Sequence, residues 1–205
     1  MTSVTVAHAW LLRAALLPAD AARDAWRSWT AATDVNALDE ASTWLLPQLY
    51  QNLSTRGVAT PAELTRYENV FRHNWYKNNL RLHQARPRIN AISRTGRTPL
   101  LTGPSALAVG YYDALAARPF DEVTLNTAAD GDVRTIAWKD LQLRVPGPAA
   151  MLDAVFARQD TWDPRSHLLW IVDAAMIVRR HPDLTPGAGG MAKAIDGLRS
   201  LGVLP

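Results

Sequence analysis

Apolar residues recur at three- and four-residue steps through roughly the first half of the chain, a spacing typical of amphipathic helices. The pattern predicts a helix over residues 4–17 and a second over 21–32, with Asp20 as its N-cap. A third helix is predicted over 38–56. Because Pro47 lies inside it, we expect either a kink or two shorter helices there.

The most clearly marked helix start lies at residues 60–63, which read Thr-Pro-Ala-Glu. The threonine can cap the helix, the proline suits its first turn, and the glutamate can complete a capping box. Apolar residues then continue at helical spacing for several turns. We expect Pro87 to bend or break this helix, and a further piece over 89–94 to stop at Gly96.

Beyond Gly96 the pattern changes from helices alone to short strands mixed with helices. Strands are expected at residues 100–101 and 120–126, with a helix over 106–116 between them. Residues 133–138 and 141–145 resemble an antiparallel pair. Further helices are expected over 149–157, 166–180 and 192–201.

These elements predict an α+β fold that is mostly helical, with a small mixed sheet flanked by N- and C-terminal helices. We divide the chain into a helical region at 1–96, an α/β core at 97–147 and a second helical region at 148–205. The length of 205 residues fits one domain, so we expect the three regions to form a single interleaved unit.

Composition narrows the classes of function. The chain has no cysteine, which excludes disulfides, thiolate metal sites and cysteine nucleophiles, and agrees with the cytoplasmic location that we expect. No stretch reaches the roughly 18 apolar residues of a membrane span, so no membrane partner is expected. The formal net charge is +3, and the basic residues are scattered except between positions 81 and 97.

The stretch from residue 99 to 126 has the layout of a phosphate and metal site. A short apolar strand leads into a tight turn at Gly103, a helix follows, and a second strand begins with acidic residues. A helix N-terminus attracts anionic groups, and carboxylates attract hard cations. The sequence therefore directs attention to the turn and to the start of the second strand.

The order of short blocks in this stretch resembles the uncharacterised bacterial nucleotidyltransferase family of the DNA polymerase β superfold. The blocks are Leu101-Thr102-Gly103, Ala106-Leu107-Ala108, Tyr111-Tyr112-Asp113, Arg118 and Glu122-Val123-Thr124. Residues 44–53 and 169–177 are similar to helices that flank this core in the family. The likeness covers about residues 25 to 180, and it implies a sheet of the nucleotidyltransferase type.

The resemblance implies transfer of a nucleoside monophosphate from a nucleoside triphosphate, with two Mg²⁺ ions held by carboxylates. It assigns Gly103 and Ser105 to the turn that meets the triphosphate. Arg118 is the candidate for a further phosphate contact, although it could instead anchor Glu122. Mg²⁺ and a nucleoside triphosphate are thus the cofactors expected of an active enzyme, and none is expected otherwise.

The resemblance assigns the first catalytic carboxylate and metal ligand to Glu122. Asp121 is an alternative ligand, but neighbouring residues of a regular strand point to opposite faces, so both cannot face one site. Asp132 is a candidate third acid from a later strand. If Glu122 is structural instead, we expect it to pair with Arg118 or Arg134.

Three residues depart from the family pattern at positions that should carry chemistry. Thr102 replaces a lysine that could meet phosphate, Pro104 removes a backbone N–H from the turn, and Thr124 replaces the second carboxylate. The leading hypothesis is therefore a nucleotidyltransferase-fold protein with a decayed site. It would be an accessory or repurposed component of a bacterial biosynthetic pathway, acting with a small molecule, a peptide or a pathway protein.

Two alternatives stay open. The first is an active Mg²⁺-dependent nucleotidyltransferase that modifies a small molecule or peptide. The second is a nucleic-acid-binding module that uses residues 81–97, which we disfavour because its basic residues lack interleaved aromatic side chains. Separately, Asp173 lies in an apolar helix, so we expect it to form a structural bond to an arginine or a tryptophan.

Overall fold

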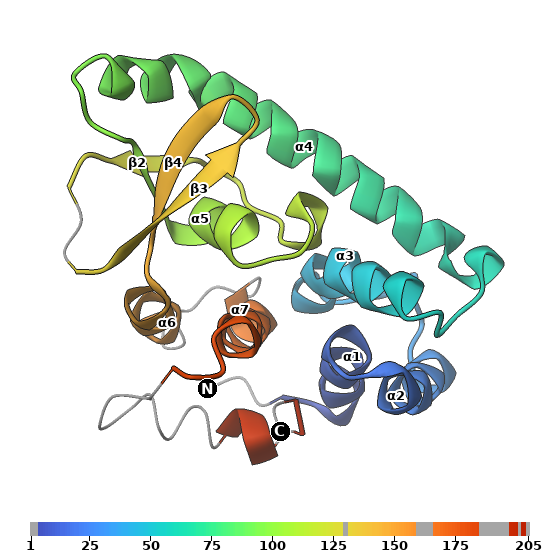
Figure 1. Ribbon diagram of the computed structural model, residues 1–205. Coiled ribbons are helices and arrows are strands. Elements are labelled where there is room, and N and C mark those ends of the chain that lie inside the picture. The colour runs from blue at the N-terminus through green and yellow to red at the C-terminus, as the bar shows by residue number, and fades with distance from the viewer. Residues whose placement is uncertain (1–3, 129–130, 159–165, 185–196, 201, 204–205) are drawn as a thin grey trace.

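The computed structural model describes residues 4–128, 131–158, 166–184, 197–200 and 202–203. Figure 1 shows the arrangement of its helices and strands. The helices are α1 (Val6–Leu16), α2 (Ala19–Ala32), α3 (Glu40–Thr55), α4 (Pro61–Ser93), α5 (Gly103–Gly110), the 3₁₀ turn η1 (Leu115–Ala117), α6 (Pro148–Phe156) and α7 (Ser166–Arg180). The strands are β1 (Leu100–Thr102), β2 (Thr124–Asn126), β3 (Val133–Trp138) and β4 (Leu141–Pro146). Most of the final helix predicted over 192–201 lies outside the described residues.

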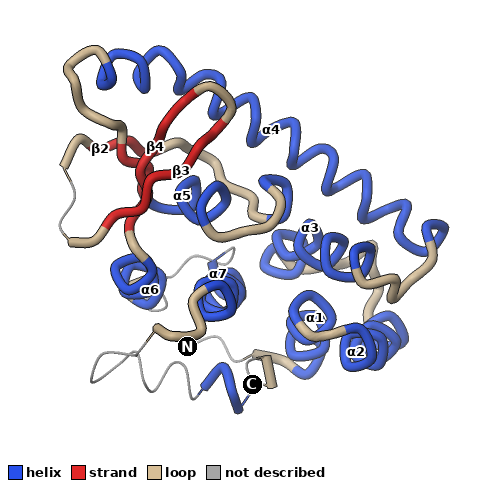
Figure 2. The backbone as a smooth tube through the Cα atoms, viewed as in Figure 1, coloured by secondary structure: helices blue, strands red, loops and turns tan. Residues whose placement is uncertain are grey.

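The predicted fold class is confirmed at the level of an α+β protein with mostly helical content and one small mixed sheet. Figure 2 shows the strands gathered in one part of the molecule, with helices α1 to α3 in another. α7 contacts both α1 and α3, and α4 contacts both α3 and η1. The N- and C-terminal helical regions therefore pack on each other, in line with the interleaved arrangement.

The sheet has the strand order β2-β1-β4-β3. β1 runs antiparallel to β2, with Thr102 opposite Thr124, and parallel to β4, with Leu100 opposite Arg144. β3 and β4 form the predicted antiparallel hairpin, which turns at Lys139 with a positive φ of 54°. This order puts β1, which leads into the Gly103 turn, in the middle of the sheet and β2 at one edge.

The N-terminal helices pack around an aromatic cluster. Trp26 and Trp29 of α2 stack with ring centroids 5.5 Å apart, and Tyr67 of α4 meets Trp26 edge-on at 5.4 Å. All three side chains are buried, and such ring pairs add to the hydrophobic stabilisation. The apolar stripe of α3 is equally buried, so it packs into the same core.

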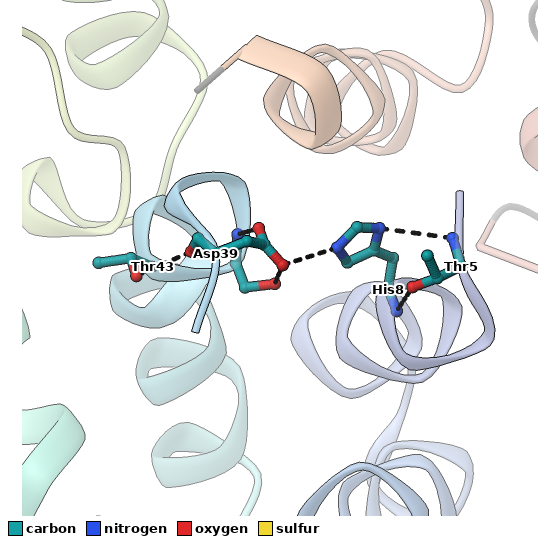
Figure 3. A network of polar contacts seen from close by, with 5 residues as sticks. Thr5, His8, Asp39 and Thr43 are labelled. Carbon is teal, nitrogen blue, oxygen red and sulfur yellow. Dashed lines mark hydrogen bonds and ion pairs between the residues drawn. The ribbon is translucent and has the colours of Figure 1, made fainter. Parts of the chain in front are cut away.

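A polar contact joins the starts of two helices in this region, as Figure 3 shows. His8 Nε2 lies 2.9 Å from the Asp39 carboxylate, which caps α3 by accepting a hydrogen bond from the Ser42 N–H at 2.8 Å. His8 also forms a capping box with Thr5 at the start of α1. Burial alone would raise the pKa of Asp39, but the hydrogen bonds from His8 and Ser42 outweigh it, so the pKa is lowered.

Three helix predictions need correction. Asp20 does not cap α2, because Pro18 is the N-cap and Asp20 lies in the first turn. Of the two outcomes expected at each proline, the structure excludes the break, because α3 runs past Pro47 and α4 runs past Pro87 to Ser93. A bend at either proline stays a prediction. A proline costs a helix one hydrogen bond, and packing of the buried apolar faces of both helices offsets that loss.

The elements around the Gly103 turn are shorter than predicted. α5 ends at Gly110, so that the buried Tyr111 and Tyr112 lie beyond the helix. Tyr111 donates its hydroxyl to the Pro146 carbonyl at 2.6 Å, which ties the end of α5 to β4. β2 begins only at Thr124.

Replacing the cap of α3 tests the polar contact between α1 and α3. We expect Asp39→Ala to lower the free energy of unfolding at pH 7 by about 1 kcal/mol, measured by urea denaturation. Asp39→Asn should lower the free energy of unfolding by less, because asparagine caps helices as well as aspartate does.

The same pair of proteins gives a pH test. The hydrogen bonds from His8 and Ser42 hold the pKa of Asp39 in the folded protein below its usual value. Its stabilisation is therefore complete above that value and is lost as the pH falls through the folded pKa. The difference in free energy of unfolding between the wild type and Asp39→Ala should therefore become smaller in acid. A difference that becomes larger would contradict this account.

Candidate functional site

The Gly103 turn joins β1 to α5. Gly103 has a φ of +65°, a conformation in which residues with a β-carbon are strained. Pro104 follows it in the first turn of α5 and has no N–H. Ser105 is fully buried and donates its hydroxyl to the Thr102 carbonyl at 3.1 Å. The hydroxyl of Ser105 therefore helps to close the turn.

Strand pairing brings the acidic segment beside this turn. Because Thr102 lies opposite Thr124, the residues just before β2 come next to the start of α5. Glu122 is exposed there, and its carboxylate lies 3.5 Å from the Thr124 hydroxyl. Of the acidic candidates, Glu122 is thus the one that the structure brings to the Gly103 turn with Thr124.

An arginine that sequence reasoning missed lies against the same turn. A β-carbon added to Gly103 would be only 3.2 Å from Nη2 of Arg158, which follows α6. Burial and the nearby positive charge of Arg118 lower the pKa of the Arg158 guanidinium, while the charges of Asp173 and Glu122 act in the opposite direction. The turn is therefore flanked by a half-buried cation as well as by the Glu122 carboxylate.

No local signal in the sequence marks Arg158. It lies 55 positions after Gly103, beyond the hairpin and α6, and no motif includes it. Only the packing of α6 relative to α5 brings the two residues together.

The other two carboxylates predicted for this site lie elsewhere. Asp121 is ion-paired with Arg81 of α4 at 3.1 Å. Asp132 precedes β3 and packs against Gly147, whose N–H donates to the Asp132 carbonyl at 2.7 Å. β3 and β2 are the two edges of the sheet, three strand spacings or about 14 Å apart, so Asp132 is not brought to Glu122.

The three predicted catalytic carboxylates thus have separate surroundings. Among the described residues, no group of three or more histidine, aspartate or glutamate side chains is placed to hold a metal ion. Glu122 and Asp121 were predicted as metal ligands on a strand, but both residues precede β2. The Asp121 carboxylate accepts a hydrogen bond from Arg81 of α4.

Arg118 lies in the interior, with an exposed fraction of 4%. Its Nε and Nη2 atoms donate to the two carboxylate oxygens of Asp173 in α7 at 2.7 and 2.8 Å. The prediction that Asp173 bonds to an arginine is confirmed. The prediction that Arg118 anchors Glu122 is wrong, because the Arg118 guanidinium is bound to Asp173. The other partner expected for Glu122, Arg134, contacts His181.

Tyr112 completes this ion pair. Its hydroxyl donates to the Asp173 carboxylate at 2.6 Å, and it is buried like the two charged residues. Burial and the adjacent negative charge of Asp173 raise the pKa of Tyr112 well above its usual value. Burial alone would lower the pKa of Arg118, but Asp173 reverses that effect and the pKa is raised. The phenol stays neutral and the guanidinium charged.

Two asparagines of α4 hold the backbone on the other side of Arg118. Asn78 donates to the carbonyls of Leu115 and Arg118 at 2.8 and 2.9 Å, and Asn74 donates to the carbonyl of Ala116. Both asparagines are buried. These two polar side chains of α4 are therefore structural, since they fix the 3₁₀ turn η1 that leads into Arg118.

Comparisons with protein-family models, curated proteins and solved structures find no match to this chain. None of the described helices has both the length and the apolar character that crossing a bilayer requires. The chemistry of the site therefore has to be argued from its own residues.

The ion pair predicts a clear stability result. We expect Asp173→Leu or Arg118→Met alone to lower the free energy of unfolding by about 3–5 kcal/mol, because each leaves a buried charge without its partner. The double variant Arg118→Met/Asp173→Leu should lose much less than the sum, because no charge remains buried. Urea denaturation of the four proteins measures this cycle. Additive losses would contradict direct coupling.

Proposed function

We propose that this chain is a nucleotidyltransferase-fold protein whose nucleotide and metal site has decayed. It then serves as an accessory or repurposed component of a bacterial biosynthetic pathway, with a small molecule, a peptide or a pathway protein as its partner. The proposal rests on the order of sequence blocks described above and on the register that brings the Glu122 segment beside the Gly103 turn.

The main support for a decayed metal site is the distribution of charge around the Gly103 turn. A two-metal site needs several carboxylates that converge on the cations. Here Thr124 is neutral, Asp121 is bound to Arg81, and the half-buried Arg158 guanidinium lies against Gly103. A fixed cation at this point opposes a dication and favours an anionic group.

The turn itself is also less suited to a triphosphate. Pro104 cannot donate a backbone hydrogen bond, and Ser105 uses its hydroxyl on the Thr102 carbonyl. The guanidinium of Arg158 lies against the turn and carries a positive charge that attracts anions. A single carboxylate, phosphate or sulfate group matches that charge better than a metal-bound triphosphate does.

Calorimetric titration with ATP, GTP, CTP and UTP, with and without Mg²⁺, tests the decay. We expect no Mg²⁺-dependent binding by the wild type, because the site has one carboxylate beside a guanidinium. Mg²⁺-dependent binding that Glu122→Gln abolishes would contradict the proposal and favour the alternative of an active nucleotidyltransferase.

A restored variant tests the fold assignment separately. Thr102→Lys, Pro104→Ser and Thr124→Asp together return the groups that the family pattern has at these positions. We expect this variant to bind a Mg²⁺–nucleotide at least tenfold more tightly than the wild type, a gain of about 1.4 kcal/mol. The control carries Thr127→Asp, on the exposed residue after β2, in place of Thr124→Asp. Equal binding by the two would count against a nucleotidyltransferase-type site.

A further inference from the structure

The longest helix exposes aromatic side chains to solvent. Trp75 and Tyr76 of α4 have exposed fractions of 54% and 60%, and Leu80 one turn later has 40%. Figure 1 shows α4 along one edge of the molecule. Large aromatic residues are costly to leave in water, so a contiguous exposed group of them marks a surface for a partner.

Tyr76 and Leu80 belong to one stripe along α4, which we name the α4 stripe, and Trp75 lies about 100° around the helix from Tyr76 at the border of the stripe. Its members are three or four positions apart, and each is exposed or half-buried: Tyr76, Leu80, His83, Pro87, Asn90 and Arg94, with Trp75 beside the first. Residues at this spacing lie on one side of a helix. At 1.5 Å per residue the stripe is about 27 Å long.

The charge along this part of the chain has one sign. Between residues 69 and 112 the sequence has no aspartate or glutamate, while its basic residues are Arg72, Lys77, Arg81, Arg86, Arg88, Arg94 and Arg97. Acidic residues from other segments meet two of them, with Arg81 bound to Asp121 and Arg86 to Asp140. Arg72 is also paired with Glu68 of the same helix, so three of the seven basic residues have acidic partners. The segment still has a surplus of positive charge.

A hollow lies on the stripe two turns beyond the aromatic residues. It is lined by His83, Arg86, Pro87, Asn90 and Arg94. The side chains of this lining include an imidazole, an amide and two guanidinium groups, of which Arg86 is paired with Asp140 outside the lining and Arg94 adds a second positive charge. Pro87 also leaves the His83 carbonyl without its helical donor, which loosens the helix at this point. The hollow therefore suits a phosphate group.

The arrangement favours an elongated polyanion over a folded protein partner. A protein interface has an apolar core with a charged rim around it. Here the aromatic surface and the basic hollow lie in line along the helix instead. A second copy of this chain using the same face would oppose two basic stripes, which repel each other.

We propose that the α4 stripe binds single-stranded nucleic acid, with unpaired bases stacked on Trp75 and Tyr76 and the phosphate backbone following the basic residues to the hollow. Base stacking on aromatic side chains and charge attraction to the backbone are the two contributions that such binding uses. Trp75 and Tyr76 supply the aromatic surface that residues 81–97 lack. This activity is independent of the Gly103 turn and of the function proposed for it.

Fluorescence anisotropy with labelled oligo(dT) and oligo(U) of about 15 nucleotides tests the proposal, within the usual site sizes of single-strand binders. We expect binding at low salt. We expect Trp75→Ala and Tyr76→Ala each to raise Kd at least about fivefold, the lower limit for loss of one stacked base. Trp75→Phe should keep most of the affinity, because its ring still stacks. Both positions, Trp75 and Tyr76, are exposed, so we expect the fold to be preserved in all three variants.

Salt dependence tests the backbone contacts. The logarithm of the binding constant should fall with the logarithm of salt concentration, and Lys77→Gln should reduce the slope by about 0.7 for one lost phosphate contact. Arg13→Gln removes the same charge from an exposed position on α1, so it should leave the slope unchanged.

Three outcomes would overturn the proposal. The first is a failure to bind either oligonucleotide at low salt. The second is an equal affinity for the matched duplex and the single strand, or an unchanged affinity in the two alanine variants. Either result would mean that bases do not stack on Trp75 and Tyr76. The third is Trp75-dependent binding of poly-L-glutamate without binding of the oligonucleotides, which would assign the stripe to an acidic polypeptide.

Discussion

The buried ion pair between Arg118 and Asp173 constrains the rest of the structure. Arg118 follows the 3₁₀ turn η1 in the middle of the chain, and Asp173 lies in α7, yet two hydrogen bonds of 2.7 and 2.8 Å join their charged groups in the interior. Neither charge can be buried without the other, because an unpaired ion in the core costs several kcal/mol. The pair therefore fixes the central segment against the C-terminal helix.

The same pair sets the surroundings of the candidate site. Asn74 and Asn78 of α4 hold the backbone that leads into Arg118, and Tyr112 at the end of the α5 segment completes the polar cluster. These contacts join α4, α5 and α7 around one point. Arg158 lies near enough to feel the charges of both Arg118 and Asp173, and it contacts the Gly103 turn. We propose that metal chemistry is lost because the single carboxylate at the turn, Glu122, lies near the positive charge of Arg158.

Local patterns in the sequence were sufficient for most elements. The capping box of Thr60 and Glu63, the hairpin of β3 and β4, and the need of Asp173 for a bonding partner, an arginine or a tryptophan, could all be predicted, because each depends on neighbouring residues or on the cost of a buried charge. The continuation of α4 through Pro87 could not, since tertiary packing outweighs the local penalty.

The site was harder to predict because it depends on strand order and on helix packing. The sequence suggested that Asp132 could join Glu122, but β2 and β3 form opposite edges of the sheet. Arg158 has no motif around it, and its approach to Gly103 depends on where α6 packs. The exposure of Trp75 and Tyr76 could not be predicted either, because Trp75 is seven positions before the buried Leu82, a spacing that is typical of one helix face.

Hydrogen–deuterium exchange of an Asp173→Asn variant is the most direct test of the central constraint. Loss of the charge on Asp173 should release Arg118, so we expect the amides of residues 111–120 and 168–178 to lose protection together, while those of α1 and α2 keep it. Unchanged protection in both segments would contradict the claim that this ion pair holds the central segment to α7.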